Sequence, residues 1–424
     1  MKSNTYQTKS IASLGRITTG RTPSTNNDNN FGGRIPFVTP RDLDGRRTIS
    51  TTERYLTTSG LKEVSAALIP AGSIMVSCIG SDMGKVAIAG KDCVTNQQIN
   101  SITVLDPEIS PEFLYYTLAP LKNYLLHLGS GGTALPILNK TDFSKLKLQF
   151  PPLSEQKRIA HILGTLDDKI ELNRQMNRTL EAMARALFKS WFIDFDPVRA
   201  KMEGRQPAGL DPETAALFPE RLVDSELGLI PEGWEVKPLD RIAKFLNGTA
   251  IRKYRPENDD EAYLRAIKIR EMRDGFSEKS DTVTRDIPKK FIIEDGDVLF
   301  SWSGSLLVQI WTGGRGALNQ HIFKVTSKNY PKWFIYEWTR HHLDMFQRIA
   351  ASKATTMGHI NRGHLSQALC AIPPKPTLTA INKSAEDFLS KSIKLNIENR
   401  TLEATKAELL PLLFQTAPTL HIQP

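Results

Sequence analysis

The hexapeptide Asn-Arg-Thr-Leu-Glu-Ala occurs twice in the chain, at residues 177–182 and again at residues 399–404, an offset of 222. Four other matches follow the same order at nearly the same spacing. They are residues 71–74 with 295–298, residues 96–99 with 319–322, Asn139 with Asn361, and Pro151-Pro152 with Pro373-Pro374. Ordered matches whose offsets drift by only one or two residues indicate two copies of one architecture, with small loop insertions.

Each copy has the same internal order, a β-rich region, a Pro-Pro break and then a long helical segment. The strand candidates are short β-branched or apolar runs bounded by turn residues. They are residues 34–38, 73–79, 86–89 and 102–105 in the first copy and 263–267, 297–302 and 322–326 in the second. Helices are predicted at 111–118, 121–128 and 331–349. The predicted fold class is α+β, with two pseudo-repeated α/β domains separated by an antiparallel coiled coil of two long helices.

The helical segments carry apolar residues at alternating spacings of four and three, which is typical of a coiled-coil seam. Ser154 is a suitable N-cap for the first helix. Its seam is Ile159, Leu163, Leu166, Ile170, Asn173, Asn177, Leu180, Ala184, Leu187 and Trp191. The second seam is Ile381, Ala385, Phe388, Ser392, Leu395, Asn399, Leu402, Lys406, Leu409 and Leu413, and Pro411 is predicted to end that helix early.

Two packing arrangements fit these seams. Each helix could pack on its own globular domain, but two matched seams in one chain favour packing against each other, and a dyad-related pair would run antiparallel. The first helix, residues 154–191, would be about 57 Å long at ~1.5 Å per residue. The predicted domains are residues 1–152, helix 153–192, linker 193–233, second domain 234–374, helix 375–416 and tail 417–424. The proline-rich linker is predicted to be extended, with a short helix near residues 212–217 as an option.

Composition and motifs exclude several classes of protein. The formal charge of +9 is compatible with a polyanionic partner. No stretch of ~18 apolar residues predicts a membrane span. The three cysteines lack metal-ligand or disulfide spacing, which favours a reduced, cytoplasmic protein. Residues 80–85, Gly-Ser-Asp-Met-Gly-Lys, imitate a phosphate loop but are one residue short between the glycines. The sequence therefore predicts no metal site, no bound cofactor and no catalytic residue.

Basic and amide side chains remain as candidates for nucleic-acid contacts, because arginine, asparagine and glutamine read purine edges while lysine and arginine neutralise phosphates. Basic residues cluster at Arg41, Arg46 and Arg47 and again at Arg252, Lys253 and Arg255. By loop position, the predicted DNA contacts are Arg41, Lys85, Gln97, Thr133 and Asn139 in the first domain. Their predicted counterparts are Arg252, Trp302, Gln320, Thr355 and Asn361. Gln97 with Gln320 and Asn139 with Asn361 are repeat mates, so a role in the fold or at a phosphate is the alternative for them.

The sequence resembles the specificity subunits of type I restriction–modification enzymes. The resemblance rests on Phe150-Pro151-Pro152-Leu153-Ser154-Glu155-Gln156, on residues 172–174 and 180–184, on the run 187–195 and on Ile230-Pro231-Glu232-Gly233-Trp234. The second copy departs from it at residues 374–377, Pro-Lys-Pro-Thr, which lack the Ser-Glu-Gln sequence.

The resemblance implies a non-catalytic subunit that binds double-stranded DNA and reads a bipartite, asymmetric site with one domain per half-site. It implies docking of two methyltransferase subunits, which use S-adenosylmethionine to modify adenine N6, and of endonuclease/translocase subunits, which use ATP and Mg²⁺. The aromatic residues Phe188, Trp191 and Phe192 fit either a methyltransferase dock or core packing. A coiled-coil adaptor without a DNA-reading role and an inactive orphan subunit are the alternatives.

Overall fold

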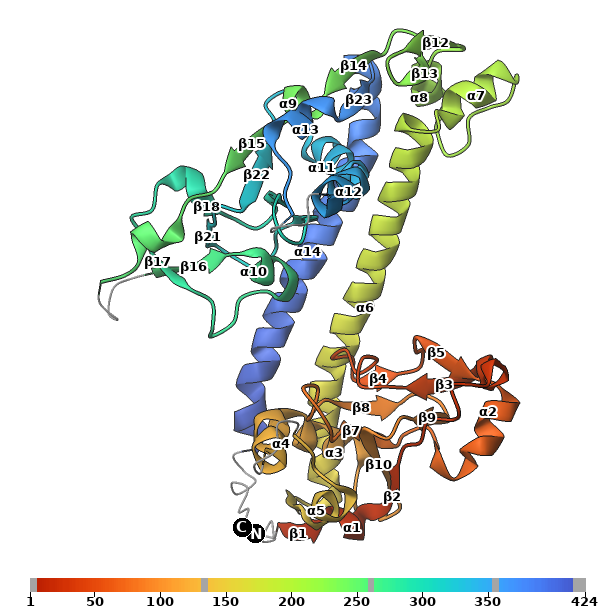
Figure 1. The fold of residues 1–424 in the computed structure, drawn as a ribbon, viewed down its shortest axis with the longest axis vertical. Coiled ribbons are helices and arrows are strands. Elements are labelled where there is room, and N and C mark those ends of the chain that lie inside the picture. The colour runs from red at the N-terminus through yellow and green to blue at the C-terminus, as the bar shows by residue number, and fades with distance from the viewer. Residues whose placement is uncertain (1–5, 131–135, 258–262, 353–357, 415–424) are drawn as a thin grey trace. The chain divides into compact units, whose positions relative to one another are not determined.

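The computed structural model describes residues 6–130, 136–257, 263–352 and 358–414, and its contacts divide the chain into two units. Unit 1 is Met1–Glu171 with Leu402–Pro424, and unit 2 is Leu172–Thr401. The helices α6 (Leu153–Phe192) and α14 (Lys375–Phe414) both cross the division. Each unit therefore contains one globular α/β part and a portion of both long helices (Figure 1).

Unit 1 contains three sheets with strand orders β2-β10-β7-β8-β4, β5-β3-β9-β6 and β1-β11. The strands are β1 (Gln7–Ser10), β2 (Gly15–Thr19), β3 (Phe31–Val38), β4 (Thr48–Ile49), β5 (Arg54–Leu56), β6 (Leu68–Ile69), β7 (Ile74–Ser77), β8 (Val86–Ala89), β9 (Cys93–Thr95), β10 (Ile99–Val104) and β11 (Lys147–Phe150). The helices are α1 (Ile11–Leu14), α2 (Thr58–Glu63), α3 (Pro111–Leu118), α4 (Lys122–Gly129) and α5 (Lys140–Lys145), with 3₁₀ turns η1 (Asp28–Asn30), η2 (Ser65–Ala67) and η3 (Ala119–Leu121).

Unit 2 has sheets of order β15-β22-β19-β20, β17-β16-β21-β18 and β14-β23, and a hairpin, β12-β13. The strands are β12 (Leu222–Ser225), β13 (Gly228–Pro231), β14 (Glu235–Pro238), β15 (Lys244–Asn247), β16 (Tyr263–Ile267), β17 (Thr282–Thr284), β18 (Ile292–Ile293), β19 (Val298–Ser301), β20 (Leu307–Ile310), β21 (Gly316–Leu318), β22 (Ile322–Thr326) and β23 (Leu369–Ile372). The helices are α7 (Asp196–Met202), α8 (Pro212–Ala216), α9 (Leu239–Ile242), α10 (Ile269–Asp274), α11 (Lys332–His341), α12 (Leu343–Ser352) and α13 (Arg362–Gln367), with η4 (Ile251–Tyr254) and η5 (Lys289–Phe291).

The two globular parts share one strand order. The sheet β15-β22-β19-β20 repeats β2-β10-β7-β8, the sheet β17-β16-β21-β18 repeats β5-β3-β9-β6, and β14-β23 repeats β1-β11. Even the mixed pairing is kept, because β3 runs parallel to β9 and β16 runs parallel to β21. The predicted fold class and strands are confirmed. The helix predicted over residues 331–349 is two helices, α11 and α12, which meet at His342.

The ends of the long helices belong to the cores of the globular parts. In unit 1, Ile159 and Leu163 of α6 are buried in the same core as Phe113 of α3. The end of α14 joins this core, and the rings of Phe113 and Phe414 stack with centroids 5.4 Å apart. The alternative that each helix packs on its own globular domain therefore describes only the start of each helix, because the end of α14 packs on the core of unit 1 and the end of α6 on that of unit 2.

The aromatic residues at the end of α6 form part of the core of unit 2. Phe188, Trp191 and Phe192 are all buried, and the Phe192 ring lies 5.3 Å from Phe334 and 5.7 Å from Trp234, centroid to centroid. Of the two readings of this cluster, the structure supports core packing, because buried rings offer little surface to a docking subunit.

The long helices also contact each other, and they run antiparallel. In unit 2, Asn173 Nδ2 donates to Asn399 Oδ1 at 2.9 Å and Asn177 Nδ2 donates to Asn396 Oδ1 at 2.7 Å. The residue numbers of the paired asparagines rise along α6 and fall along α14, as in an antiparallel pair of helices. In unit 1, Lys406 Nζ donates to Asp167 Oδ1 at 2.6 Å. Of the predicted seam, Ile159, Leu163, Ile170, Trp191 and Leu395 are buried, and Leu166, Leu180, Leu187, Leu402 and Leu409 are half-buried.

Two details of the prediction were wrong. Pro411 lies inside α14, which continues to Phe414, because apolar residues of this last turn pack on the core of unit 1. The connector after α6 contains the short helix expected near residues 212–217, which is α8, but it is not otherwise extended, since α7 and the β12-β13 hairpin also form there. Phe195, Val198 and Phe218 anchor this segment, because each is buried in the core of unit 2.

Candidate nucleic-acid interface

In unit 1, loops from distant parts of the sequence meet at one edge of the two larger sheets. Thr22 Oγ1 donates to Gln97 Oε1 at 2.6 Å, which joins the loop after β2 to the loop after β9. Lys85 Nζ donates to the carbonyl of Pro40 at 3.1 Å, which joins the β7-β8 turn to the loop after β3. Gly80 N donates to Pro136 O at 2.9 Å, and this brings in the segment before α5. We call this set of loops the unit 1 loop edge.

The equivalent loops meet in unit 2. Trp302 Nε1 donates to Asn247 Oδ1 at 2.9 Å, and Ser303 Oγ lies 3.0 Å from His321 Nδ1. Gly304 N donates to Gly358 O at 2.8 Å, as Gly80 does to Pro136 in unit 1. These contacts join the loops after β15, β19 and β21 and the segment before α13, and we call them the unit 2 loop edge.

A glycine makes the close approach of two loops possible in both units. A Cβ atom on Gly20 would lie 2.1 Å from the carbonyl oxygen of Asn96, and one on Gly248 would lie 2.1 Å from that of Asn319. No side chain fits at such a distance, so the shape of each loop edge depends on these glycines.

The predicted contact residues fall into groups. Arg41, Gln97, Arg252 and Gln320 are exposed on these loops, and Lys85 and Trp302 are half-buried there. Asn139 and Asn361 instead cap α5 and α13, since their Oδ1 atoms accept from Asp142 N at 2.9 Å and His364 N at 3.2 Å. Their shared role is therefore a helix cap. Thr133 and Thr355 lie outside the described residues.

Two of the predicted counterpart pairs are not structurally equivalent. Trp302 matches Cys78, because the backbone N–H of each donates across the sheet, to His321 O at 3.2 Å and to Gln98 O at 2.7 Å. Lys85 matches Leu307 in the strand register, and Arg252 lies on η4, which follows β15. The pairs Lys85–Trp302 and Arg41–Arg252 were wrong, because the two members of each pair lie on different segments of the repeated fold.

The two predicted basic clusters differ in whether their side chains form ion pairs within the fold or are exposed to solvent. Arg46 Nε lies 2.9 Å from Asp44 Oδ2, and Arg47 Nη2 lies 2.5 Å from Asp168 Oδ1 on α6. Burial opposes ionisation of the Asp44 carboxyl, but the hydrogen bonds from Arg46 and its positive charge together outweigh burial and lower the pKa of that carboxyl. In contrast, Arg252, Lys253 and Arg255 are exposed on and after η4.

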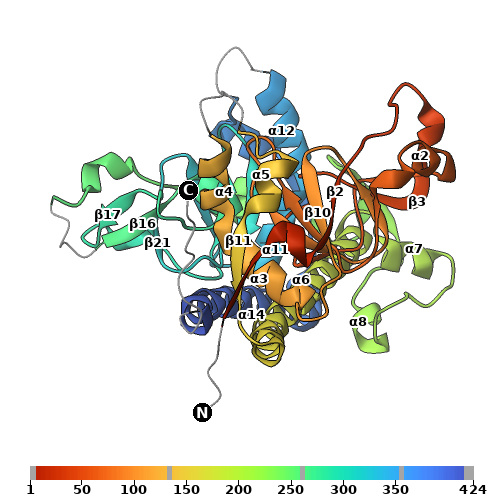
Figure 2. The ribbon, with the colours of Figure 1, turned by 90° about the horizontal axis from the view of Figure 1, so that it is seen from below.

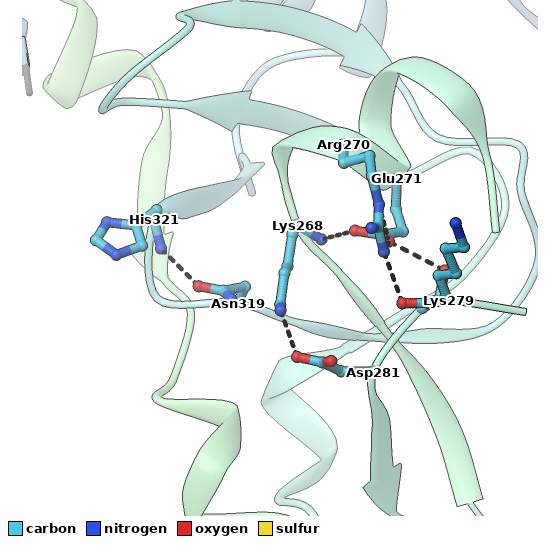
Figure 3. Close-up of polar contacts among 8 residues, drawn as sticks. Lys268, Arg270, Glu271, Lys279, Asp281, Asn319 and His321 are labelled. Carbon is cyan, nitrogen blue, oxygen red and sulfur yellow. Dashed lines mark hydrogen bonds and ion pairs between the residues drawn. The ribbon is translucent and has the colours of Figure 1, made fainter. Parts of the chain in front are cut away.

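A buried acid that no sequence motif marks, Glu271 of α10, lies beside the unit 2 loop edge. Its side chain is 0% exposed, and Arg270 Nη2 donates to its Oε1 at 2.6 Å while Lys268 N donates to its Oε2 at 3.2 Å (Figure 3). Ser280 Oγ donates to Oε1 at 3.0 Å. Glu271 thus joins the start of α10, the Arg270 guanidinium and the segment that precedes β17.

Replacing Glu271 by alanine should destabilise unit 2. The Lys268 amide and the Ser280 hydroxyl would lose their acceptor, and a lost buried partner costs about 1–3 kcal/mol. Denaturant unfolding should show a lower midpoint. The matched control is Glu278→Ala, since Glu278 is exposed in the same segment and should leave the midpoint within error. Equal midpoints for the two variants would contradict the role of Glu271.

Comparison with known proteins identifies the family to which these two domains belong. The sequence model described as "Type I restriction modification DNA specificity domain" matches residues 3–182 and 231–407, one match for each copy. The chain belongs to this family. The type I restriction enzyme MjaIX specificity subunit of Methanocaldococcus jannaschii is 29% identical, over 96% of this chain and 92% of that one. The HindI specificity subunit of Haemophilus influenzae is 26% identical, over 82% of this chain and 86% of that one.

The fold is also that of a solved structure. The S subunit of a type I restriction–modification system from M. genitalium aligns over 97% of both chains with a TM-score of 0.58 at 15% identity. At that identity the match concerns the fold.

The described residues of this specificity protein hold no cluster of His, Cys, Asp and Glu suited to a metal ion. The phosphate-loop imitation at 80–85 is a turn between β7 and β8, in which Gly80 and Gly84 have φ of 85° and 83°. All three cysteines are buried, and burial raises the pKa of the Cys78 thiol to about 11. None of the helices in the described part of the chain is long and apolar enough to span a membrane.

Proposed function

We propose that this chain is the DNA-reading subunit of a type I restriction–modification complex, in which each loop edge binds one half of a bipartite, asymmetric DNA sequence. The observation that carries the proposal is that the two domains share one strand order but differ in the side chains at equivalent positions of their loop edges. The strand order is the same in both domains, yet Gln98 and Lys85 stand where His321 and Leu307 stand.

These differences support an asymmetric target. Side chains that reach base edges determine which sequence is bound, whereas the framework and phosphate contacts set position. A lysine that is replaced by leucine, or a glutamine by histidine, changes the donors and acceptors offered to a base. Two domains that differ at such positions should read two different half-sites.

The remaining activities of the complex are assigned to partners. We place adenine-N6 methylation with S-adenosylmethionine on two methyltransferase subunits, and ATP- and Mg²⁺-dependent translocation and cleavage on endonuclease subunits, in the cytoplasm. This chain then binds no cofactor itself. Support for a docking surface comes from Leu172 and Met183 of α6, which are 52% and 45% exposed and lie eleven residues, or about three turns, apart on one helix face.

A domain exchange tests the proposal. Residues 234–374 would be replaced by the matching segment of a relative, and the assembled complex would be used to select bound sequences from a random DNA library. One half-site should change and the other should stay the same. A coiled-coil adaptor without a reading role would show no sequence preference before or after the exchange.

A further inference from the structure

One arginine occupies the same place in both loop edges, although the sequence offset hides it. The strands β3 and β16 are equivalent, and Asn96 N donates to Val38 O at 2.9 Å as Asn319 N donates to Ile267 O at 3.2 Å. Counting on from Val38 and Ile267, the third residue is Arg41 in unit 1 and Arg270 in unit 2. Their offset is 229, whereas the repeat elsewhere has offsets of 222–224.

The acid that follows each arginine confirms the equivalence. Asp42 Oδ2 accepts from the backbone N–H of Thr39 at 2.7 Å, and Glu271 Oε2 accepts from that of Lys268 at 3.2 Å. Each acid also binds the segment before the next strand of the same sheet. Asp42 Oδ1 accepts from Glu53 N at 2.9 Å, just before β5, and Glu271 Oε1 accepts from Ser280 Oγ at 3.0 Å, just before β17. The turn that carries the arginine is therefore built in the same way twice.

The two guanidinium groups point to a ligand outside the fold. Arg270 uses Nε and Nη2 on Glu271 Oε1, at 3.0 and 2.6 Å, and Nη2 also donates to Lys279 O at 2.8 Å, while half of the side chain stays exposed. This fork fixes the guanidinium plane and leaves Nη1 directed away from the acid (Figure 3). Arg41 is exposed, and its side chain makes no hydrogen bond or ion pair with the described residues.

We propose that Arg41 and Arg270 are equivalent contacts to DNA phosphates, one in each half-site, that anchor the domains independently of sequence. The inference rests on the proposed function. A side chain that is kept in two domains with different reading positions cannot carry the difference between their targets. Phosphate oxygens are present in every sequence, and the guanidinium group binds them well because of its planar set of donors.

The test measures the salt dependence of DNA binding by the full chain assembled with its methyltransferase subunits. Arg41→Ala and Arg270→Ala should each lower the slope of log K against log salt by about 0.9, which corresponds to about eightfold weaker binding at 0.1 M salt if the contact contributes nothing at 1 M. The loss should be equal on the native target and on a target with one altered half-site. Arg270→Lys, which keeps the charge, should restore the slope.

Control variants lie at the opposite ends of the same sheets. Arg34 is exposed near the start of β3, and Arg285 is exposed just after β17, so Arg34→Ala and Arg285→Ala should leave the slope unchanged. An unchanged slope for Arg41→Ala and Arg270→Ala would overturn the inference, and so would a new base preference in the selected sequences. If the wild-type complex binds DNA without any sequence preference, the proposed function is wrong, and the salt slopes still decide whether these arginines contact phosphates.

Discussion

Four residues inserted into α6 between Asn173 and Leu180 are expected to lengthen the spacer between the two half-sites and to leave both half-site sequences unchanged. Four residues add about one helical turn, ~6 Å, so the seam keeps its face. Because base pairs follow each other at ~3.4 Å, the spacer should grow by one or two base pairs. Binding to the original site should fall by about a thousandfold or more, toward non-specific affinity.

The antiparallel pairs suggest how to design this experiment. An insertion between Asn173 and Asn177 in α6 alone cannot keep both the Asn173–Asn399 and the Asn177–Asn396 pair, whereas a second insertion of four residues between Asn396 and Asn399 in α14 keeps both pairs matched. The doubly extended variant should therefore be the more stable of the two. Four residues inserted into the turn between β12 and β13 are the control, because that hairpin is not part of the seam. A spacer that stays the same in the doubly extended variant would contradict the expectation that the paired long helices set the distance between the half-sites.

Phe192→Ala is expected to lower the free energy of unfolding of unit 2 by about 3–5 kcal/mol, the usual cost of removing a buried phenyl ring. Phe192 is 1% exposed, and its ring lies within 6 Å of Trp234, Trp333 and Phe334, centroid to centroid. The substitution would leave a cavity where α6 joins the globular part. Met183→Ala on the same helix, at a side chain 45% exposed, should cost less than about 0.5 kcal/mol.

Tryptophan fluorescence reports this change selectively. The chain has six tryptophans, at positions 191, 234, 302, 311, 333 and 338, and all of them fall within unit 2. Denaturant unfolding followed by fluorescence therefore measures unit 2, and a shift of the Phe192→Ala midpoint no larger than that of Met183→Ala would show that the ring is not a core contact.

The sequence predicted the fold better than the site. A repeat predicts that two segments share a topology without fixing the topology itself, and the shared strand orders bear this out. The 4-3 spacing predicted both helices, but it could not separate a docking surface from core packing at Phe188 and Trp191, because both uses need the same spacing. The burial of these rings against unit 2 distinguishes them.

Local structure was least predictable where tertiary packing overrides the intrinsic preference of a residue, or where loop length differs between the two copies. Pro411 breaks an isolated helix, yet the core of unit 1 holds the last turn. The connector looked extended because of its prolines, yet Phe195 and Phe218 are buried. Arg270 was missed because extra loop residues moved it from the expected offset to 229. Only the strand register reveals its equivalence with Arg41.

The most direct test of the central claim is methylation mapping by long-read sequencing, in cells that carry this chain with its cognate methyltransferase subunit and in cells from which this chain is deleted. The account predicts modified adenines in a split sequence motif, with two unlike halves and a fixed unread spacer, and it predicts that the motif vanishes on deletion. A methylome that is the same with and without the chain would contradict the claim that this chain selects the DNA target.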